Sequence, residues 1–333
     1  MIDAVTTPVF EDYWHFAAER QRIFYARTRL GESPWTADCV LQLYRFTCPF
    51  RAADRVSQYL IRRVIYASES SVQEAFFRII FFKTFNRIKT WELIESTLGE
   101  VRWSEYTFNR YARVLSDAKQ RGERLYSGAY IMPSGCEPFG YEQKHKNHLR
   151  LIERMMRECV PKRITAAASM KEAYEIFLGY PTIGPFLAYQ YVVDINYSEL
   201  TNFSEMEFVM AGPGARSGIR KCFAIKGRYS DEDLIRYVAE HQDEEFARRG
   251  LHFQTLWGRP LQLVDCQNLF CEVDKYARIA HPEFNAVGKR NRIKQKFRPN
   301  PEPIDYWFPP KWGINERIPP RTNKPNYSPM AST

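Results

Sequence analysis

The segment Gln73–Asn86 (QEAFFRIIFFKTFN) constrains the fold more than any other stretch of the chain. Its apolar residues do not keep to one face of a helix but surround it almost completely. A helix of this kind is stable only when other elements cover most of its sides, so it predicts a central, buried helix. The chain has 333 residues, 44% of them hydrophobic, which is enough for one large core or for two lobes that share an interface.

The rest of the chain also shows helical periodicity up to the tail. We expect a loop over residues 126–141, which contain three glycines and two prolines, and a helix capped by Ser104 that runs through Ala118. Later helices are expected over residues 165–178, from Pro185, after Phe203, from Ser230 to about 249, and over 264–280. The predicted fold is mainly α. It has an N-terminal helical lobe (1–160), a second lobe (161–288) with a cleft between the two, and a basic, proline-rich tail (289–333).

Charge and cysteine usage narrow the classes of function. Lysine and arginine number 48 against 39 acids, a net charge of +9, and this favours a polyanionic partner. No stretch is apolar over the roughly 18 residues of a membrane span, and the acidic N-terminus does not read as a secretory signal, so we expect a cytoplasmic protein. The seven cysteines are irregularly spaced and form no CxxC pair. We therefore expect no disulfide framework, no metal and no cofactor.

The stretch Leu178–Asn196 carries the most informative motif. Within it, Tyr180-Pro181-Thr182-Ile183-Gly184 followed by Ala188 resembles the hairpin of DNA-repair glycosylases, whose pattern is apolar-Pro-Gly-apolar-Gly-x-x-x-Ala. A glycine turn before a helix exposes backbone N–H groups that accept a DNA phosphate. The resemblance implies a helix-hairpin-helix DNA-glycosylase-like fold, with residues 161–288 as its catalytic lobe. Thr182 stands where the first glycine is expected, and the alternative interpretation is an ordinary turn between packed helices.

Two glutamates follow the hairpin at an informative distance. Helix-hairpin-helix glycosylases carry a catalytic carboxylate roughly 20 residues after the second glycine, and Glu205 and Glu207 lie 21 and 23 positions after Gly184. We expect them in the first turn of a helix, just before Gly212-Pro213-Gly214. Acids at that place also serve as ordinary helix caps, and this alternative stays open.

Five separate stretches resemble a family associated with phage DNA-base hypermodification. It includes α-glutamyl and putrescinyl thymine pyrophosphorylases, the helical domain of 5-hydroxymethyl-deoxyuridine DNA kinases, and anti-phage DNA glycosylases that act on glucosylated hydroxymethylcytosine. The matching stretches span about residues 40–285, and the GPG and QNLFCE motifs are the most specific. They are 76–91, 128–132 with 139–148, 194–197, 207–218 and 265–278. The family pattern has an aspartate where Glu207 stands. Its kinase activity is not implied, because the sequence contains no GxxxxGK[ST] motif.

The resemblance implies an enzyme that flips a hypermodified pyrimidine out of double-stranded DNA, such as phage DNA, and hydrolyses its N-glycosidic bond. A carboxylate would stabilise the sugar cation, with Glu207 the first candidate, Asp194 the second and Glu205 the third. The candidate base pocket is formed by Phe82, Phe85, Asn86, Phe139, Gln267 and Asn268, each of which is more often a core or packing residue. The candidate contacts to the DNA backbone are Thr182, Gly184, Lys144, Lys146, Lys289 and Arg290.

Phe186 and two histidines carry further expectations, and two alternative functions stay open. Phe186 occupies the position of the Schiff-base lysine of strand-cutting glycosylases, so the enzyme is expected to be monofunctional and to leave an abasic site. His145 and His148 are expected at the surface or facing DNA, and no obligate protein partner is expected. The first alternative is an enzyme of pyrophosphorylase or transferase type that modifies a flipped 5-substituted pyrimidine without removing it. The second is a non-catalytic DNA-binding module.

Overall fold

The computed structural model places the apolar segment at the centre of a layer of helices. It describes residues 3–28, 34–68, 70–288, 291–300 and 304–319. Helix α4 spans Val72–Phe85, and every residue from Phe76 to Phe85 is buried. The side chain of Ser71 accepts a hydrogen bond from the N–H of Glu74 and caps the first turn, and Asn86 ends the helix in the left-handed conformation. The predicted central helix is confirmed.

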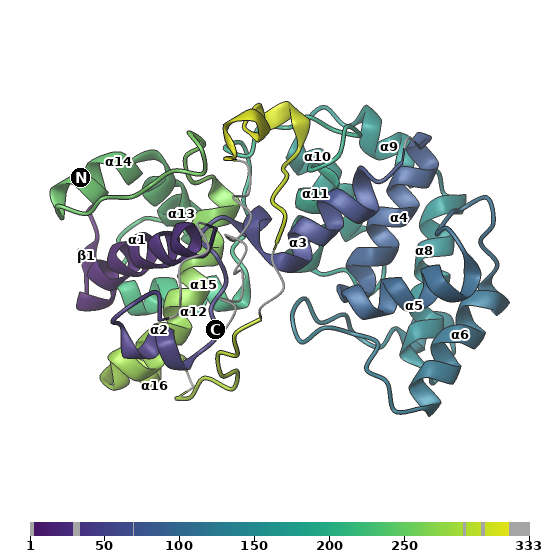
Figure 1. Cartoon of the computed structure of the whole chain (residues 1–333), viewed down its shortest axis with the longest axis horizontal. Coiled ribbons are helices and arrows are strands. Elements are labelled where there is room, and N and C mark those ends of the chain that lie inside the picture. Colours follow the sequence, from purple (N-terminus) through teal and green to yellow (C-terminus); the bar gives the residue numbers. More distant parts are fainter. Residues whose placement is uncertain (1–2, 29–33, 69, 289–290, 301–303, 320–333) are drawn as a thin grey trace, which may run out of the picture.

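The protein is mainly α, as predicted, and its helices form two groups that lie side by side (Figure 1). The first group contains β1 (Val5–Thr6), α1 (Pro8–Thr28), α2 (Cys39–Leu43), α12 (Pro213–Cys222), β2 (Phe223–Ile225), α13 (Asp231–Glu240), α14 (Gln242–Arg248), α15 (Leu263–Ala280) and α16 (Asn285–Gly288). The second contains α4, α5 (Ile88–Leu98), α6 (Phe108–Gln120), α7 (Cys136–Phe139), α8 (Lys144–Arg157), α9 (Val160–Ala166), α10 (Met170–Leu178) and α11 (Pro185–Ile195). Helices from residues 1–160 occur in both groups, and the proposed domain boundaries and cleft stay predictions.

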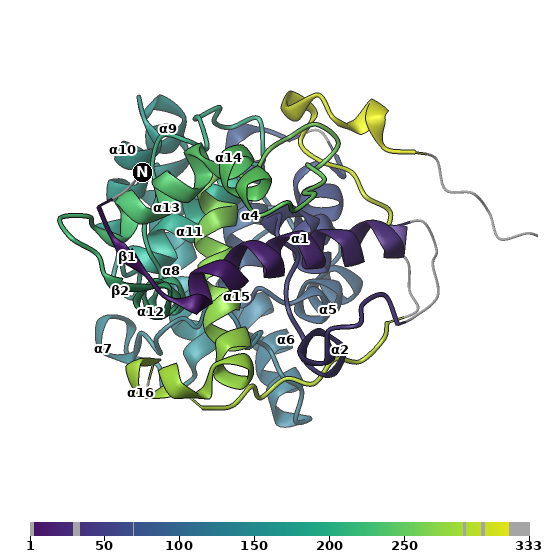
Figure 2. The same cartoon turned by 90° about the vertical axis from the view of Figure 1, so that its left-hand side faces the viewer.

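Helix α15 is the centre of the first group, and α1 runs across it (Figure 2). Helix α12 packs very closely on α15, because a Cβ atom at Gly218 would lie 1.9 Å from the carbonyl oxygen of Phe270. Gly214 likewise lies against Cys271 of α15. The GPG and QNLFCE motifs therefore contact each other, and glycine is required there for helix packing. Strands β1 and β2 pair antiparallel beside them.

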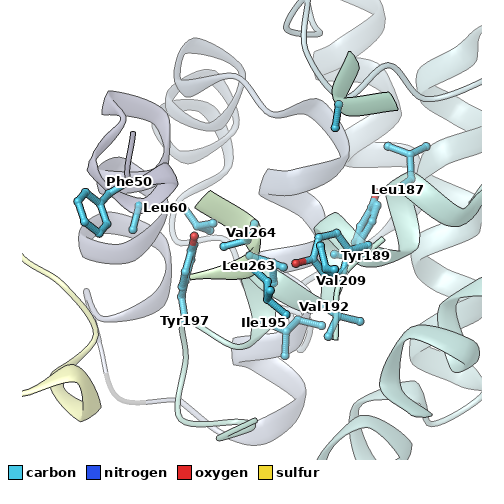
Figure 3. Close-up of a cluster of buried hydrophobic side chains, with 14 of the residues drawn as sticks. Phe50, Leu60, Leu187, Tyr189, Val192, Ile195, Tyr197, Val209, Leu263 and Val264 are labelled. Atoms are coloured by element: carbon cyan, nitrogen blue, oxygen red, sulfur yellow. The ribbon is translucent and has the colours of Figure 1, made fainter. Parts of the chain in front are cut away.

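The chain crosses from the first group to the second through a 3₁₀ turn, Arg51–Ala53, which packs on α15 and leads into α3 (Arg55–Tyr59). A π-helical turn, Leu60–Ile65, continues from α3 and packs on α4. The chain returns after α11. At this crossing a buried apolar layer joins α11 to the first turn of α15, where Tyr189, Ile195 and Leu263 lie together (Figure 3).

The described part of the tail lies along the protein surface. Lys296 pairs with Tyr44 in an isolated β-bridge, and the N–H of Trp307 donates to Oε1 of Gln58. Two 3₁₀ turns follow, Pro310–Trp312 and Asn315–Arg317. Lys311, in the first of these turns, donates hydrogen bonds from its amine to the carbonyl oxygens of Ser198 and Thr201, just after α11. Among the described residues, no helix is long and apolar enough to cross a membrane.

Four sequence-based expectations about helices are wrong. The helix expected from Ser230 to about 249 is interrupted at His241, which separates α13 from α14. The helix expected after Phe203 begins at Pro213, because the Asn196 side chain bonds both the N–H and the carbonyl of Phe203 and holds the segment in a loop. The helix expected from Ser104 begins at Phe108, because the N–H of Ser104 donates to Glu74. The helix expected over 165–178 is broken in two, and Ser169 caps its second part, α10.

Candidate functional site

A fully buried group of charged side chains lies where the chain crosses between the two groups of helices. We call Arg51, Lys83 and Asp194 the charged cluster. Asp194, in the last turn of α11, places Oδ1 2.6 Å from Nη2 of Arg51 and Oδ2 2.9 Å from Nζ of Lys83. The three side chains are between 1% and 4% exposed. Three formal charges are thus removed from water, with two cations sharing one carboxylate.

Arg51 is held on all sides by neighbouring polar groups. Its Nε donates to Oε1 of Gln190 at 3.1 Å, and its Nη1 donates to the hydroxyl of Tyr197 at 2.9 Å. Its backbone N–H donates to Oδ1 of Asp265 at 2.8 Å. The other oxygen of Asp265 accepts from the N–H of Gln262 and forms part of the capping box that begins α15. Arg51 therefore links the ends of α11 and α15 at one point.

The ammonium of Lys83 is much less well satisfied. In the described part of the chain, Nζ has no hydrogen-bond acceptor besides its ion-pair partner Asp194. It lies 3.7 Å from the ring centroid of Tyr130, so the aromatic face covers its free side. An ammonium group can donate three hydrogen bonds, and a buried donor without a partner is costly. The free side of Lys83 is therefore a place where an added acceptor would be favourable.

Aromatic and amide groups surround this position. The ring of Tyr130 stacks on Phe186, in the first turn of α11, with the centroids 5.9 Å apart. A Cβ atom at Gly212 would lie 2.6 Å from the ring of Phe186 and 3.3 Å from Nε2 of Gln267. Gly212 therefore leaves room for Gln267 and for Phe186, the ring that stacks on Tyr130.

The environment changes the proton affinity of these groups. Burial lowers the pKa of Lys83 to about 7, against the opposing effect of Asp194. Burial opposes ionisation of Asp194 as well, but Arg51 and Lys83 outweigh it and hold the pKa of this carboxyl below its ordinary value. Burial raises the pKa of Asp265 to about 7 although two backbone N–H groups bond it. Burial thus brings the pKa values of both Lys83 and Asp265 close to neutral pH.

The hairpin motif forms a turn that leads into α11. Gly184 is the N-cap of α11 and Pro185 its first residue, as predicted. Thr182 adopts a φ of 70°, the left-handed region that glycine prefers, so it takes the conformation expected of the missing glycine. Its hydroxyl is buried without a hydrogen-bond partner.

The three candidate carboxylates lie in different environments. Glu207 is exposed and lies in a turn, not in the predicted first helical turn. Glu205, in the same turn, is half-buried and forms an ion pair of 2.7 Å with Arg259. Asp194 is the only one of the three in the charged cluster. The catalytic roles assigned to them stay predictions.

The candidate base-pocket residues do not all come together. Phe82, Phe85 and Asn86 lie at the end of α4, where Phe82 stacks on Tyr59 and Phe85 on Tyr126. Asn268 donates to Thr47 on the other group of helices. Phe139 lines a separate surface groove beside α8. Gln267 alone reaches the site, next to Phe186.

The candidate backbone contacts also lie apart. Gly184 is exposed at the hairpin, whereas Lys144 covers the ring of Tyr126 and Lys146 is half-buried on α8. Lys289 and Arg290 lie outside the described residues. The expectation that His145 and His148 face solvent or DNA is wrong, since both are buried. His145 bonds Ser116, and His148 bonds Tyr126 and the carbonyl oxygen of Pro133.

Sequence reasoning missed most of the cluster. Lys83 carried a signal, because a lysine inside a helix that is apolar on every face has to be buried. Arg51 and Tyr130 carried no comparable signal, since Asp194 is 143 positions away from Arg51 in sequence and Lys83 is 47 positions away from Tyr130. Asp265 was visible only as part of the motif DCQNLFCE.

Comparison with known proteins identifies a matching protein family and a relative. A family model described as "5-hmdU DNA kinase, helical domain" matches residues 7–286. The chain belongs to this family. The family resemblance seen in the sequence is thereby confirmed. A similar protein is the "5-hmdU DNA kinase" of Bacillus phage SP10, which is 26% identical over 311 residues.

That match covers 87% of this chain and 48% of the phage protein, so the chain spans about half the length of its curated relative. No solved structure matches the chain. The five stretches that resemble the family each contribute to the site described above. They supply Lys83, Tyr130, Asp194 with Tyr197, Gly212, and Asp265 with Gln267.

Proposed function

We propose that this protein binds DNA and modifies a 5-substituted pyrimidine that has left the duplex, without removing the base. The observation that carries the proposal is the convergence just described. Segments that are far apart in sequence, and that match the family, supply the charged cluster and the aromatic and amide groups beside it. Aromatic rings and amides are the groups that hold an extruded base.

The charge of the cluster indicates the chemistry of the substituent. Arg51 and Lys83 share the single carboxylate of Asp194, and Lys83 has donor capacity left over. A phosphoryl or pyrophosphoryl group on the 5-methylene of the pyrimidine would supply the missing negative charge. We therefore propose group transfer at the 5-methylene: an amine nitrogen bonds to this carbon, the C–O bond to the phosphoryl or pyrophosphoryl group breaks, and phosphate or pyrophosphate leaves with the electron pair while the amine loses a proton to water. Lys83, with its free donor capacity, stabilises the departing oxygens.

DNA would be held by the hairpin and by basic residues around it. Gly184 and the start of α11 are exposed next to Phe186, and the chain carries a net charge of +9. Because backbone N–H groups at a helix start bind phosphate without reading the sequence, this contact would position the duplex and leave recognition to the site. Double-stranded phage DNA with modified pyrimidines is the substrate that we propose.

We place base modification ahead of base removal. Removal requires a carboxylate that faces the developing sugar cation. Asp194 is neutralised by two cations, Glu205 by Arg259, and Glu207 lies exposed in a turn. The relative from Bacillus phage SP10 is named as a DNA kinase, which is also an activity that adds a group.

The test uses duplexes that contain a single thymine, 5-hydroxymethyluracil, 5-phosphoryloxymethyluracil or glucosylated hydroxymethylcytosine. Each is incubated with the protein, ATP, Mg²⁺ and a mixture of amino acids and polyamines. One half is digested to nucleosides for mass spectrometry, and the other is heated in alkali to reveal abasic sites. We expect a changed nucleoside mass on a 5-substituted base, with no alkali-labile site.

Two variants sharpen this test. Lys83→Met should abolish the change in mass, whereas Lys171→Met, at a lysine of α10 that is 66% exposed, should leave it intact. Alkali-labile sites would instead establish base removal, and Glu207→Gln and Asp194→Asn would then show which carboxylate acts, by a loss of about 100-fold or more. If no duplex shows a changed mass or an abasic site, an enzymatic function is refuted and a DNA-binding module remains.

A further inference from the structure

Two consecutive residues of the loop between α6 and α8 have opposite environments. Ile131 is 73% exposed, the highest value among the large apolar side chains that the described residues expose. Tyr130, directly before it, points inward and covers the amine of Lys83. One residue of the loop thus enters the site while the next presents an aliphatic side chain to solvent.

The backbone at this point is strained. Tyr130 has a φ of 54°, in the left-handed region that a residue with a bulky side chain rarely adopts. Such a conformation is unfavourable for a residue with a side chain and persists only where the surroundings enforce it. The strain is what allows Tyr130 to turn into the site while Ile131 stays outside.

The ends of the loop are firmly attached to α8. The hydroxyl of Tyr126 bonds Nδ1 of His148, and Nε2 of the same histidine bonds the carbonyl oxygen of Pro133. The side chain of Asn147 donates to the carbonyl oxygen of Ser134. Both histidine nitrogens are therefore used to fix the loop, and its central residues, 130 and 131, project from a rigid base.

The loop also lies next to the hairpin. A Cβ atom at Gly135 would lie 3.2 Å from the side chain of Thr182, and the ring of Tyr130 stacks on Phe186 in the first turn of α11. A duplex whose backbone is held at Gly184 would therefore pass close to the exposed side chain of Ile131.

We infer that residues 126–135 form the element that extrudes the base. Ile131 enters the base stack at the place that the base leaves, and the ring of Tyr130 moves away from Lys83 so that the pyrimidine takes its position. Aliphatic side chains such as isoleucine are used as wedges between base steps, and they partly unstack the duplex. Tyr130 occupies the site in the same way as a base would, with one face on the amine of Lys83 and the ring stacked on Phe186.

This inference rests on the proposed function, and its test separates the two. The probe is 2-aminopurine placed next to a 5-hydroxymethyluracil, in duplex and in single-stranded DNA, because its fluorescence rises when the neighbouring base leaves the stack. Binding is measured in the same samples by anisotropy. The variants are Ile131→Ala and, as a matched control, Ile225→Ala, an exposed isoleucine of β2 that is 60% accessible and far along the chain from the loop.

We expect Ile131→Ala to lose the fluorescence rise on duplex DNA by at least 10-fold and to bind single-stranded DNA as the wild type does. Ile225→Ala should behave as the wild type on both. Tyr130→Ala, which empties the place above Lys83, should bind the single-stranded modified base as tightly as the wild type or more tightly. Equal fluorescence rises for the wild type and Ile131→Ala would overturn the inference and leave the proposed function intact. A wild type that prefers the modified base in neither form of DNA would refute the proposed function itself.

Discussion

Replacing Lys83 by methionine tests the physical account of the charged cluster. Methionine keeps most of the apolar stem of lysine and removes the ammonium, and Asp194 retains its 2.6 Å contact with Arg51. Burial lowers the pKa of Lys83 from 10.5 to about 7. Between these two values the unfolded chain holds the proton and the folded protein does not. The free energy of unfolding of the wild type must therefore rise with pH over that interval, and the cost of the buried charge is largest below pH 7.

The magnitude follows from the shift. Between pH 7 and pH 9, proton linkage at one lysine with these pKa values raises the free energy of unfolding of the wild type by about 2 kcal/mol. Lys83→Met lacks this dependence. We expect the variant to be at least as stable as the wild type at pH 7, and its advantage to shrink by about 2 kcal/mol at pH 9. It should at the same time be inactive, because the group that binds the substrate's anion is lost.

Urea unfolding of both proteins at pH 7, 8 and 9, followed by circular dichroism, measures the difference. Subtracting the two curves removes the contributions of other groups. Asp265 is one of them: its pKa is raised from 3.8 to about 7, so its protonation stabilises the folded protein fully below pH 3.8, and this contribution is lost as the pH rises from there through about 7. Lys171→Met should run parallel to the wild type. Parallel curves for Lys83→Met as well, or a variant that is less stable by the same amount at every pH, would refute the buried-charge argument.

Other predictions follow from single contacts. Asp194→Asn leaves Arg51 buried without its carboxylate and should lower the free energy of unfolding by about 3–5 kcal/mol in urea titrations, and a loss below about 1 kcal/mol would contradict the pairing. Thr182→Gly relieves a left-handed φ of 70° and should raise the free energy of unfolding by about 0.5–1 kcal/mol. A clear decrease in that free energy would show that the contacts of the threonine matter more than the strain. Affinity for DNA should fall with salt at a log–log slope near −4 to −5 if about five phosphates are contacted, and a flat profile between low and moderate salt would exclude this binding mode. Borohydride should trap no covalent adduct with DNA, because Phe186 stands in place of a Schiff-base lysine; an adduct would redirect attention to Lys83.

The sequence predicted those parts of the fold that depend on local pattern. Helix α4 was predictable because its apolar residues surround it, and α15 because its periodicity runs unbroken from Leu263 to Ala280. The segment after Phe203 was misjudged because one side chain decides it. Asn196 bonds the backbone of Phe203 from seven residues away and replaces the hydrogen bonds that a helix would have made.

The candidate site was predictable only in part for a related reason. Asp194 and Gln267 stood in stretches that resemble the family, and the structure brings both to the site. Arg51 reaches Asp194 across 143 positions of sequence, and no periodicity or spacing encodes such a contact. Tyr130 depends on a backbone angle that its residue type rarely adopts, so propensity argues against its actual position.

The two places at which the chain crosses between its groups of helices have a mechanical consequence. Arg51 stands at the outward crossing, and Asp194 lies one residue before the end of α11, just ahead of the return crossing. Their ion pair therefore connects the two crossing segments, which would have to act as the hinge if one group of helices rotated relative to the other. An anion that competes with Asp194 for Arg51 would weaken this ion pair. Binding of an anion at the site would then be coupled to the angle between the two groups of helices. Small-angle X-ray scattering with and without pyrophosphate would register that coupling as a change in the radius of gyration, and an unchanged radius would mean that the hinge stays rigid.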